Sequence, residues 1–115
     1  MSTVTEIYVL QSISGHGLPS FISRDTNREI DVMRGALVLD GSGRYKSTLV
    51  IRESGPDGIT IRENQVTGVH HKRNNSLILR SSDGNETTLA VDGRVLRYWS
   101  NSGKEYLYAK ATVQE

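Results

Sequence analysis

The most informative property of this 115-residue chain is what it lacks. It contains no cysteine, which excludes disulfides, thiol nucleophiles and cysteine-ligated metal sites within the sequence. Proline occurs only twice, and no apolar run reaches the roughly 18 residues that a membrane-spanning helix needs. Basic and acidic residues nearly cancel, at 14 against 13, whereas domains dedicated to DNA or RNA usually carry a clear basic excess. We therefore expect neither a membrane span nor a nucleic-acid partner.

The length of the chain and its first residues indicate the number of domains and the cellular location. A chain of 115 residues fits one domain, covering 1–115. The segment Met1–Glu6 has neither the basic part nor the apolar part of a secretory signal. Together with the missing cysteines, this favours a cytoplasmic protein. An exported chain whose signal peptide had been removed would have the same composition and is the alternative.

Turn signals and short alternating segments fill the sequence. The turn signals are Asp40-Gly41-Ser42-Gly43, Gly55-Pro56-Asp57-Gly58, Asn74-Asn75, Asp83-Gly84-Asn85, Asp92-Gly93 and Ser102-Gly103. The segments between them predict strands over 6–13, 29–39, 44–52, 59–72, 76–80, 86–91, 94–100 and 104–110. About eight short strands joined by tight turns are typical of an all-β, antiparallel up-and-down meander that closes into a barrel.

The alternation of side chains predicts what faces the interior of such a barrel. In the third strand, Tyr45, Leu49 and Ile51 point to one side while Arg44 and Lys46 point to the other. The aromatic residues are mostly tyrosines, whose apolar body and polar tip suit the lining of a small-molecule site. The expected walls are Tyr8, Leu10, Tyr45, Leu49, Leu77, Leu79, Leu96, Tyr98, Tyr106 and Tyr108. A filled core with the tyrosine hydroxyls at its rim is the alternative.

Few residues suggest further chemistry. His70 and His71 are adjacent, so on a regular strand they point to opposite faces and do not share a metal ion. If Val69 faces the interior, His71 does too, and we take His71 and Arg34 as candidate polar anchors for a ligand. We expect no metal site and no cofactor, and we assign no catalytic residue, because no serine–histidine–acid set or carboxylate pair is recognisable.

Irregular positions are also predicted. Arg34-Gly35 indicates a bulge, Gly68 a bend, and Asn74-Asn75 a two-residue turn, since asparagine tolerates a positive φ. The segment 14–28 begins with two glycines and a proline, and we expect it to rim the open end of the barrel or to form a surface loop with Phe21 buried.

Three stretches resemble a known family. Tyr8–Pro19 contains tyrosine, leucine and serine leading to a glycine and Leu-Pro. Gly35–Tyr45 contains a strand that ends at an Asp-x-x-Gly turn before a tyrosine. Tyr106–Lys110 has the pattern Tyr-x-Tyr-x-Lys. Together they resemble the short bacterial lipocalin-like barrels of the calycin type. The resemblance implies a lipocalin- or streptavidin-like meander barrel with an internal cavity. The Gly-x-Trp motif of true lipocalins is absent, and the only tryptophan is Trp99.

These observations favour one function and leave two alternatives. The leading interpretation is noncovalent binding of a small, largely apolar or aromatic molecule inside the barrel. The resemblance also allows a barrel enzyme that catalyses the cyclisation or isomerisation of a reactive substrate, mainly by orienting it. The third alternative is a protein-interaction module that uses the barrel exterior or the loop from Gly15 to Arg28, for example as a homodimer formed through exposed Ile78 and Val50.

Overall fold

The computed structural model describes residues 5–24, 26–100 and 103–111, which form ten strands and no helix. The strands are β1 (Glu6–Ile13), β2 (His16–Gly17), β3 (Ser20–Arg24), β4 (Glu29–Leu39), β5 (Arg44–Gly55), β6 (Gly58–Arg73), β7 (Ser76–Ser81), β8 (Glu86–Asp92), β9 (Val95–Trp99) and β10 (Glu105–Lys110). None of the described segments is a helix long and apolar enough to cross a membrane. The all-β prediction is confirmed.

The strands form one antiparallel sheet that closes on itself. Its order is β2-β1-β10-β9-β8-β7-β6-β5-β4-β3, and an additional pairing of β1 with β4 closes the barrel. In that closing ladder, Glu6 to Val9 lie opposite Leu39 to Ala36. Eight strands, β1 and β4 to β10, therefore make an up-and-down barrel, as predicted, and β2 and β3 are additions to it.

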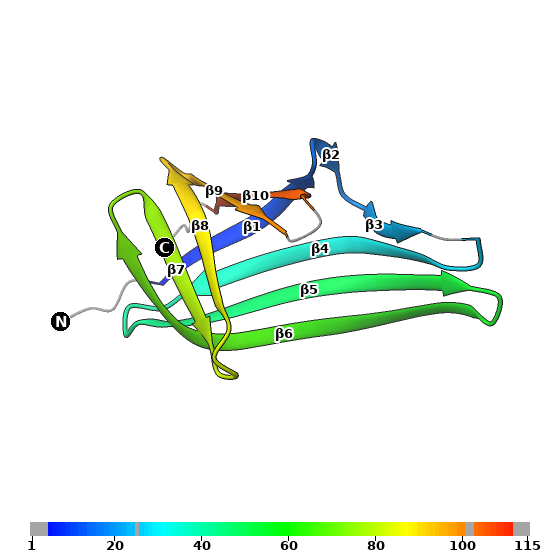
Figure 1. Ribbon diagram of the computed structural model, residues 1–115, viewed down its shortest axis with the longest axis horizontal. Coiled ribbons are helices and arrows are strands. Elements are labelled where there is room, and N and C mark those ends of the chain that lie inside the picture. The colour runs from blue at the N-terminus through cyan, green and yellow to red at the C-terminus, as the bar shows by residue number, and fades with distance from the viewer. Residues whose placement is uncertain (1–4, 25, 101–102, 112–115) are drawn as a thin grey trace.

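Three of the strands are longer than the barrel requires. Residue pairs between β5 and β6 run from Arg44–Val69 to Gly55–Gly58, but β7 pairs with β6 only from Gly68 onward. Beyond the barrel, β3 joins 29–34 of β4, 50–55 of β5 and 58–67 of β6 in a four-stranded sheet, which we call the extension. Figure 1 shows it projecting from one end of the barrel, and the molecule measures 53 × 31 × 26 Å.

Local backbone chemistry agrees with most of the predicted irregularities. Asn74 has a φ of 55° in the turn between β6 and β7, so the asparagine turn is confirmed. The register between β4 and β5 shifts between Val32 and Arg34, which confirms the bulge. At Gly68 the strand continues, but a Cβ would lie 2.0 Å from the carbonyl oxygen of Arg80. Only glycine permits this close approach of β7 to β6.

Inward-facing leucines and tyrosines form the core of the barrel. Leu37, Leu39, Leu77 and Leu96 are almost completely buried, as alternation on their strands requires. The expectation of a buried Phe21 is wrong, since that side chain is 46% exposed.

A bulge in β3 explains the error at Phe21. The register of β3 shifts between Phe21 and Ser23, so Ile22, rather than Phe21, packs against the core together with Leu18. Phe21 instead contacts the guanidinium of Arg24, which lies 4.4 Å from the centre of its ring.

Candidate functional site

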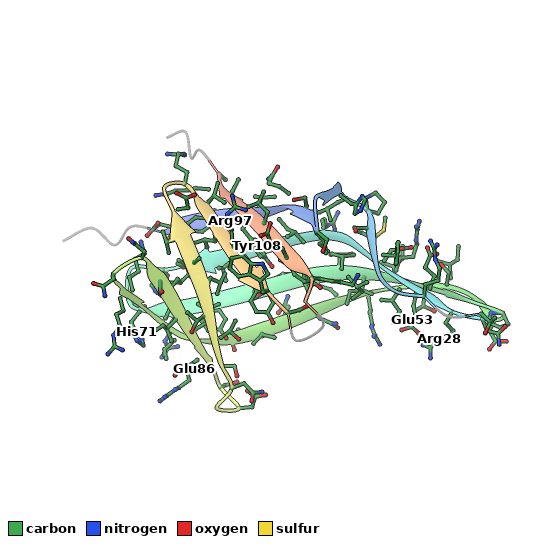
Figure 2. The ribbon with its side chains drawn as sticks, turned by 45° about the horizontal axis from the view of Figure 1, so that its top comes forward. Arg28, Glu53, His71, Glu86, Arg97 and Tyr108 are labelled. Carbon is green, nitrogen blue, oxygen red and sulfur yellow. The ribbon has the colours of Figure 1, made fainter. Side chains whose placement is uncertain are left out.

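A cavity of about 320 Å³ lies inside the barrel, at the end where Leu49 and Val66 border the extension. Strands β4 to β10 all contribute to it, because each presents alternate side chains to the interior. Figure 2 labels Tyr108, one of the residues of its wall. The lining residues are Leu37, Tyr45, Ser47, Leu49, Val66, Leu79, Thr87, Leu89, Tyr98, Ser100, Tyr106 and Tyr108. The wall is therefore apolar, with hydroxyl groups set into it.

Four tyrosines from three strands dominate the polar part of this wall. Tyr98 of β9 and Tyr106 of β10 are directly opposite each other in the sheet, and their rings lie 5.6 Å apart at an angle of 50°. Tyr108 follows two residues later on the same face, and Tyr45 comes from β5. Within the described part of the chain, the hydrogen bonds of the structure include none from these four hydroxyls. Each hydroxyl is thus available to a molecule in the cavity.

Burial fixes the protonation state of these phenols. Removal from water raises the pKa of Tyr108 to about 12, and the neighbouring Tyr106 adds to the effect. Burial likewise raises the pKa of Tyr106 and of Tyr45. The phenols of Tyr45, Tyr106 and Tyr108 therefore stay protonated at neutral pH, where they donate hydrogen bonds and do not act as bases.

At the opposite end of the barrel, an ion-pair network around Glu6 links neighbouring strands. The Glu6 carboxylate accepts hydrogen bonds from Lys72 Nζ at 3.1 Å and from the Tyr8 hydroxyl at 3.0 Å, and it lies 3.2 Å from Lys110 Nζ. Burial opposes ionisation of Glu6, but the two lysines and the phenol outweigh it and lower the pKa of the carboxyl. Burial and the bond to Glu6 raise the pKa of Tyr8 to about 12. The network ties β1, β6 and β10 together.

The structure separates the predicted wall residues into two groups. Those that line the cavity are Tyr45, Leu49, Leu79, Tyr98, Tyr106 and Tyr108. Those that are buried in the core without lining it are Tyr8, Leu10, Leu77 and Leu96. All ten thus point inward. Whether the six lining residues bind a ligand stays a prediction.

The two predicted polar anchors lie outside the barrel. Val69 is 51% exposed, so the condition for an inward His71 fails, and His71 is exposed on the outer surface (Figure 2). His70 is the histidine paired with buried Leu79, and its Nε2 lies 3.0 Å from the Asp40 carbonyl oxygen. Its Nδ1 is buried without a hydrogen-bond partner.

Arg34 is displaced from the interior by the bulge. The register shift after Val32 places Arg34 opposite Val50, on the exposed face of β4. Among the described residues, no group of three histidines, aspartates or glutamates is arranged to hold a metal ion.

Six residues that line the cavity were not among the wall residues predicted from the sequence. These are Leu37, Ser47, Val66, Thr87, Leu89 and Ser100. Ser47 lies two residues after Tyr45 and Leu89 two residues before Val91, so strand alternation places them on the same inward face. The alternation of side chains could therefore have identified both. The positions of Val66 and Thr87 depend on how far β6 and β8 extend past their neighbours, which only the assembled sheet defines.

The cavity has a second boundary between β8 and β9. These strands pair only over Ala90–Asp92 and Val95–Arg97. Beyond this short ladder, a polar cleft on the barrel wall is lined by Asn85, Glu86, Thr87, Thr88, Tyr98 and Trp99. Thr87 and Tyr98 line both the cleft and the cavity. These two side chains therefore separate the interior from the outside at a point where no hydrogen-bonded ladder does.

No known family model, curated protein or solved structure matches this chain. The structure itself shows eight antiparallel strands closed in up-and-down order, and membership of the lipocalin-like family stays a prediction. That architecture is compatible with ligand binding, but the same fold serves many unrelated functions. The function has to be argued from the cavity itself.

Proposed function

We propose that the protein binds one small, uncharged, largely apolar or aromatic molecule noncovalently inside the barrel. The observation that carries this proposal is the cavity, whose apolar walls hold four tyrosine hydroxyls without partners in the described part of the chain. An accessible hydroxyl that faces an internal space without a partner in the described part of the chain can donate a hydrogen bond to an occupant of that space.

The absence of charge in the wall supports an uncharged ligand. Every side chain that lines the cavity is apolar or carries a neutral hydroxyl. Moving an ion from water into such surroundings without an opposite charge costs many kcal/mol. The volume, about 320 Å³, lies at the lower end of the range of roughly 300–1,000 Å³ for small-molecule sites, which supports a compact ligand.

The tyrosines also indicate what the ligand carries. Because their phenols are protonated, they donate hydrogen bonds to a carbonyl, ether or similar acceptor. The tilted pair Tyr98 and Tyr106 offers ring edges and faces to a flat aromatic group. A neutral, flat molecule with one or two acceptor atoms fits these features best.

Titration with two fluorescent probes tests the proposal. We expect the neutral probe Nile red to bind saturably and the anionic probe 1-anilinonaphthalene-8-sulfonate to bind more weakly. Ser47→Phe fills the cavity and is expected to weaken Nile red binding about tenfold or more. Thr48→Phe, the neighbouring position on the outward face of β5, is the matched control and is expected to bind like the wild type.

Two results would contradict the proposal. One is a failure of Nile red to saturate the wild-type protein. The other is an equal loss of binding in Ser47→Phe and Thr48→Phe, which would place the probe outside the cavity. Circular dichroism of each variant distinguishes loss of binding from loss of fold.

A further inference from the structure

One edge of the extension is unpaired and carries the most exposed large apolar side chains. Residues 58–67 of β6 pair with β5 on one side, while β7 begins to pair only at Gly68. Ile59 and Ile61 in this segment are 68% and 63% exposed. In Figure 1, β6 forms the lower border of the extension, with no described strand beyond it.

The backbone of this segment directs hydrogen-bonding groups outward at alternate residues. The Thr67 carbonyl accepts a bond from the Ser82 N–H at 3.0 Å, away from β5, whereas the His70 N–H donates to Gly43 on the β5 side. No register shift interrupts β6 along β5. The odd-numbered residues from 59 to 65 therefore present their N–H and C=O groups to the open edge, since the Thr67 carbonyl is already bonded to Ser82.

Several features that usually protect such an edge are missing from it, and its only charged residues are Arg62 and Glu63. The segment 58–67 contains no proline and no lysine, and it has no bulge against β5. An exposed, regular edge strand with apolar side chains is a template for pairing with another strand. In contrast, Ile78 and Val50, which the sequence suggested for a dimer, are both partly buried.

We propose that two copies of this chain pair antiparallel along this edge, about a two-fold axis that passes beside Thr60. In that register, Ile59 of one copy lies opposite Ile61 of the other, and both residues offer outward-directed backbone groups. The two extensions then form one continuous sheet with a cluster of isoleucines on one face. The barrels, with their cavities, lie at opposite ends of the dimer.

Charge and apolar contact select this register over its neighbours. An axis at Arg62 would place that arginine against itself, and an axis at Glu63 would place two carboxylates together. An axis at Ile61 would set Ile59 against Glu63. Only the axis at Thr60 pairs both isoleucines with isoleucines, in a ladder that ends at Gly58, next to the hairpin turn.

The interface is small, since the ladder spans only 58–62 of each copy. Interfaces that bury less than about 1,200 Å² in total are generally weak. We therefore expect a reversible dimer with a dissociation constant of about 10–100 μM.

Sedimentation velocity over a range of protein concentrations tests for the dimer. The wild-type protein is expected to shift from monomer toward dimer as its concentration rises through about 10–100 μM. Ile61→Lys is expected to remain monomeric, because a charged side chain then faces Ile59 of the partner. Val69→Lys is the matched control, because Val69 is also an exposed β6 residue but its strand is covered there by β7. It should dimerise like the wild type.

Cysteine cross-linking tests the register in a chain that has no cysteine of its own. Thr60→Cys places two thiols opposite each other across the axis, at a spacing that suits a disulfide. Asn64→Cys is exposed on the same face of the same strand but lies away from the axis. We expect at least about tenfold faster oxidative dimerisation of Thr60→Cys.

Three outcomes would overturn the proposal. They are a wild-type protein that stays monomeric throughout, dimerisation of Ile61→Lys equal to that of the wild type, and cross-linking of Asn64→Cys as fast as that of Thr60→Cys. A wild-type protein that stays monomeric would show that a second copy of this chain does not pair with the edge.

Discussion

At the scale of single residues, the tyrosines determine both the chemistry of the cavity and its response to pH. Tyr108 is only 6% exposed, and its phenol faces an apolar interior where ionisation is unfavourable. Its pKa in the folded protein, about 12, lies above the ordinary value of 10.0 that it regains on unfolding. This difference links the ionisation of one buried hydroxyl to the stability of the whole barrel.

The linkage predicts a loss of stability at alkaline pH. Below pH 10 the phenol is protonated in both states, so its contribution is fully present. Between pH 10 and 12 the unfolded chain ionises while the folded one does not, so the free energy of unfolding falls by about 2–3 kcal/mol for a shift of this size. Urea unfolding at a series of pH values measures this fall. In Tyr108→Phe the curve should be shallower over that interval, and an unchanged slope would show that Tyr108 is not responsible.

At the scale of elements, β6 has two roles, because it is a barrel wall at one end and the edge of the extension at the other. The change occurs at Gly68, where β7 begins to pair. The backbone of Arg80 approaches so closely there that a Cβ at position 68 would lie 2.0 Å from its carbonyl oxygen. The obstacle is backbone rather than a flexible side chain, so it cannot move aside without disturbing the ladder.

Gly68→Ala is therefore expected to be strongly destabilising. We expect the free energy of unfolding to fall by about 3 kcal/mol or more, because the contact is relieved only by separating β6 from β7. Gly17→Ala is the control, since a Cβ at Gly17 meets nothing within 4 Å. Chemical denaturation of both variants measures the difference. A loss of stability at Gly68 no larger than that at Gly17 would contradict the assigned close approach.

At the scale of the whole molecule, the barrel and the extension differ in what holds them together. The barrel encloses the continuous core, whereas in the extension Val32 and Ile51 are buried but Ile59 and Ile61 are exposed. Strand β5 passes through both regions and is paired on both sides throughout. A difference in stability between the two ends of β5 therefore reports on the core beneath them.

Native-state hydrogen exchange should reveal this difference. We expect the amides of 50–54 in β5 to open at a lower free energy than those of 45–48, because fewer apolar contacts are lost when the extension opens. The measurement is residue-resolved exchange by NMR in low concentrations of denaturant. Equal opening free energies along β5 would show that the barrel and the extension unfold as one unit.

Much of this fold follows from patterns that are local in sequence. The turn at Asn74 and the bulge at Arg34-Gly35 were predictable because each depends on the backbone preferences of one or two residues. The inward tyrosines of β9 and β10 were predictable because alternation within a strand decides the face. The predictions of an inward His71 and a buried Phe21 were wrong. The face of His71 depends on how β6 pairs with its neighbouring strand, and that of Phe21 on a bulge whose position the pattern does not mark.

The sequence by itself determined the eight strands of the barrel, the turns between most of them and six of the residues that line the cavity. It did so because side-chain alternation and turn chemistry act over a few residues. Three features were decided only by the tertiary structure. Strand β1 pairs with β4 and closes the barrel, β6 extends well beyond the residues that pair with β7, and β8 and β9 pair over a short ladder only. These features depend on the relative lengths and registers of strands distant in sequence. They determine where the cavity opens and which edge remains exposed.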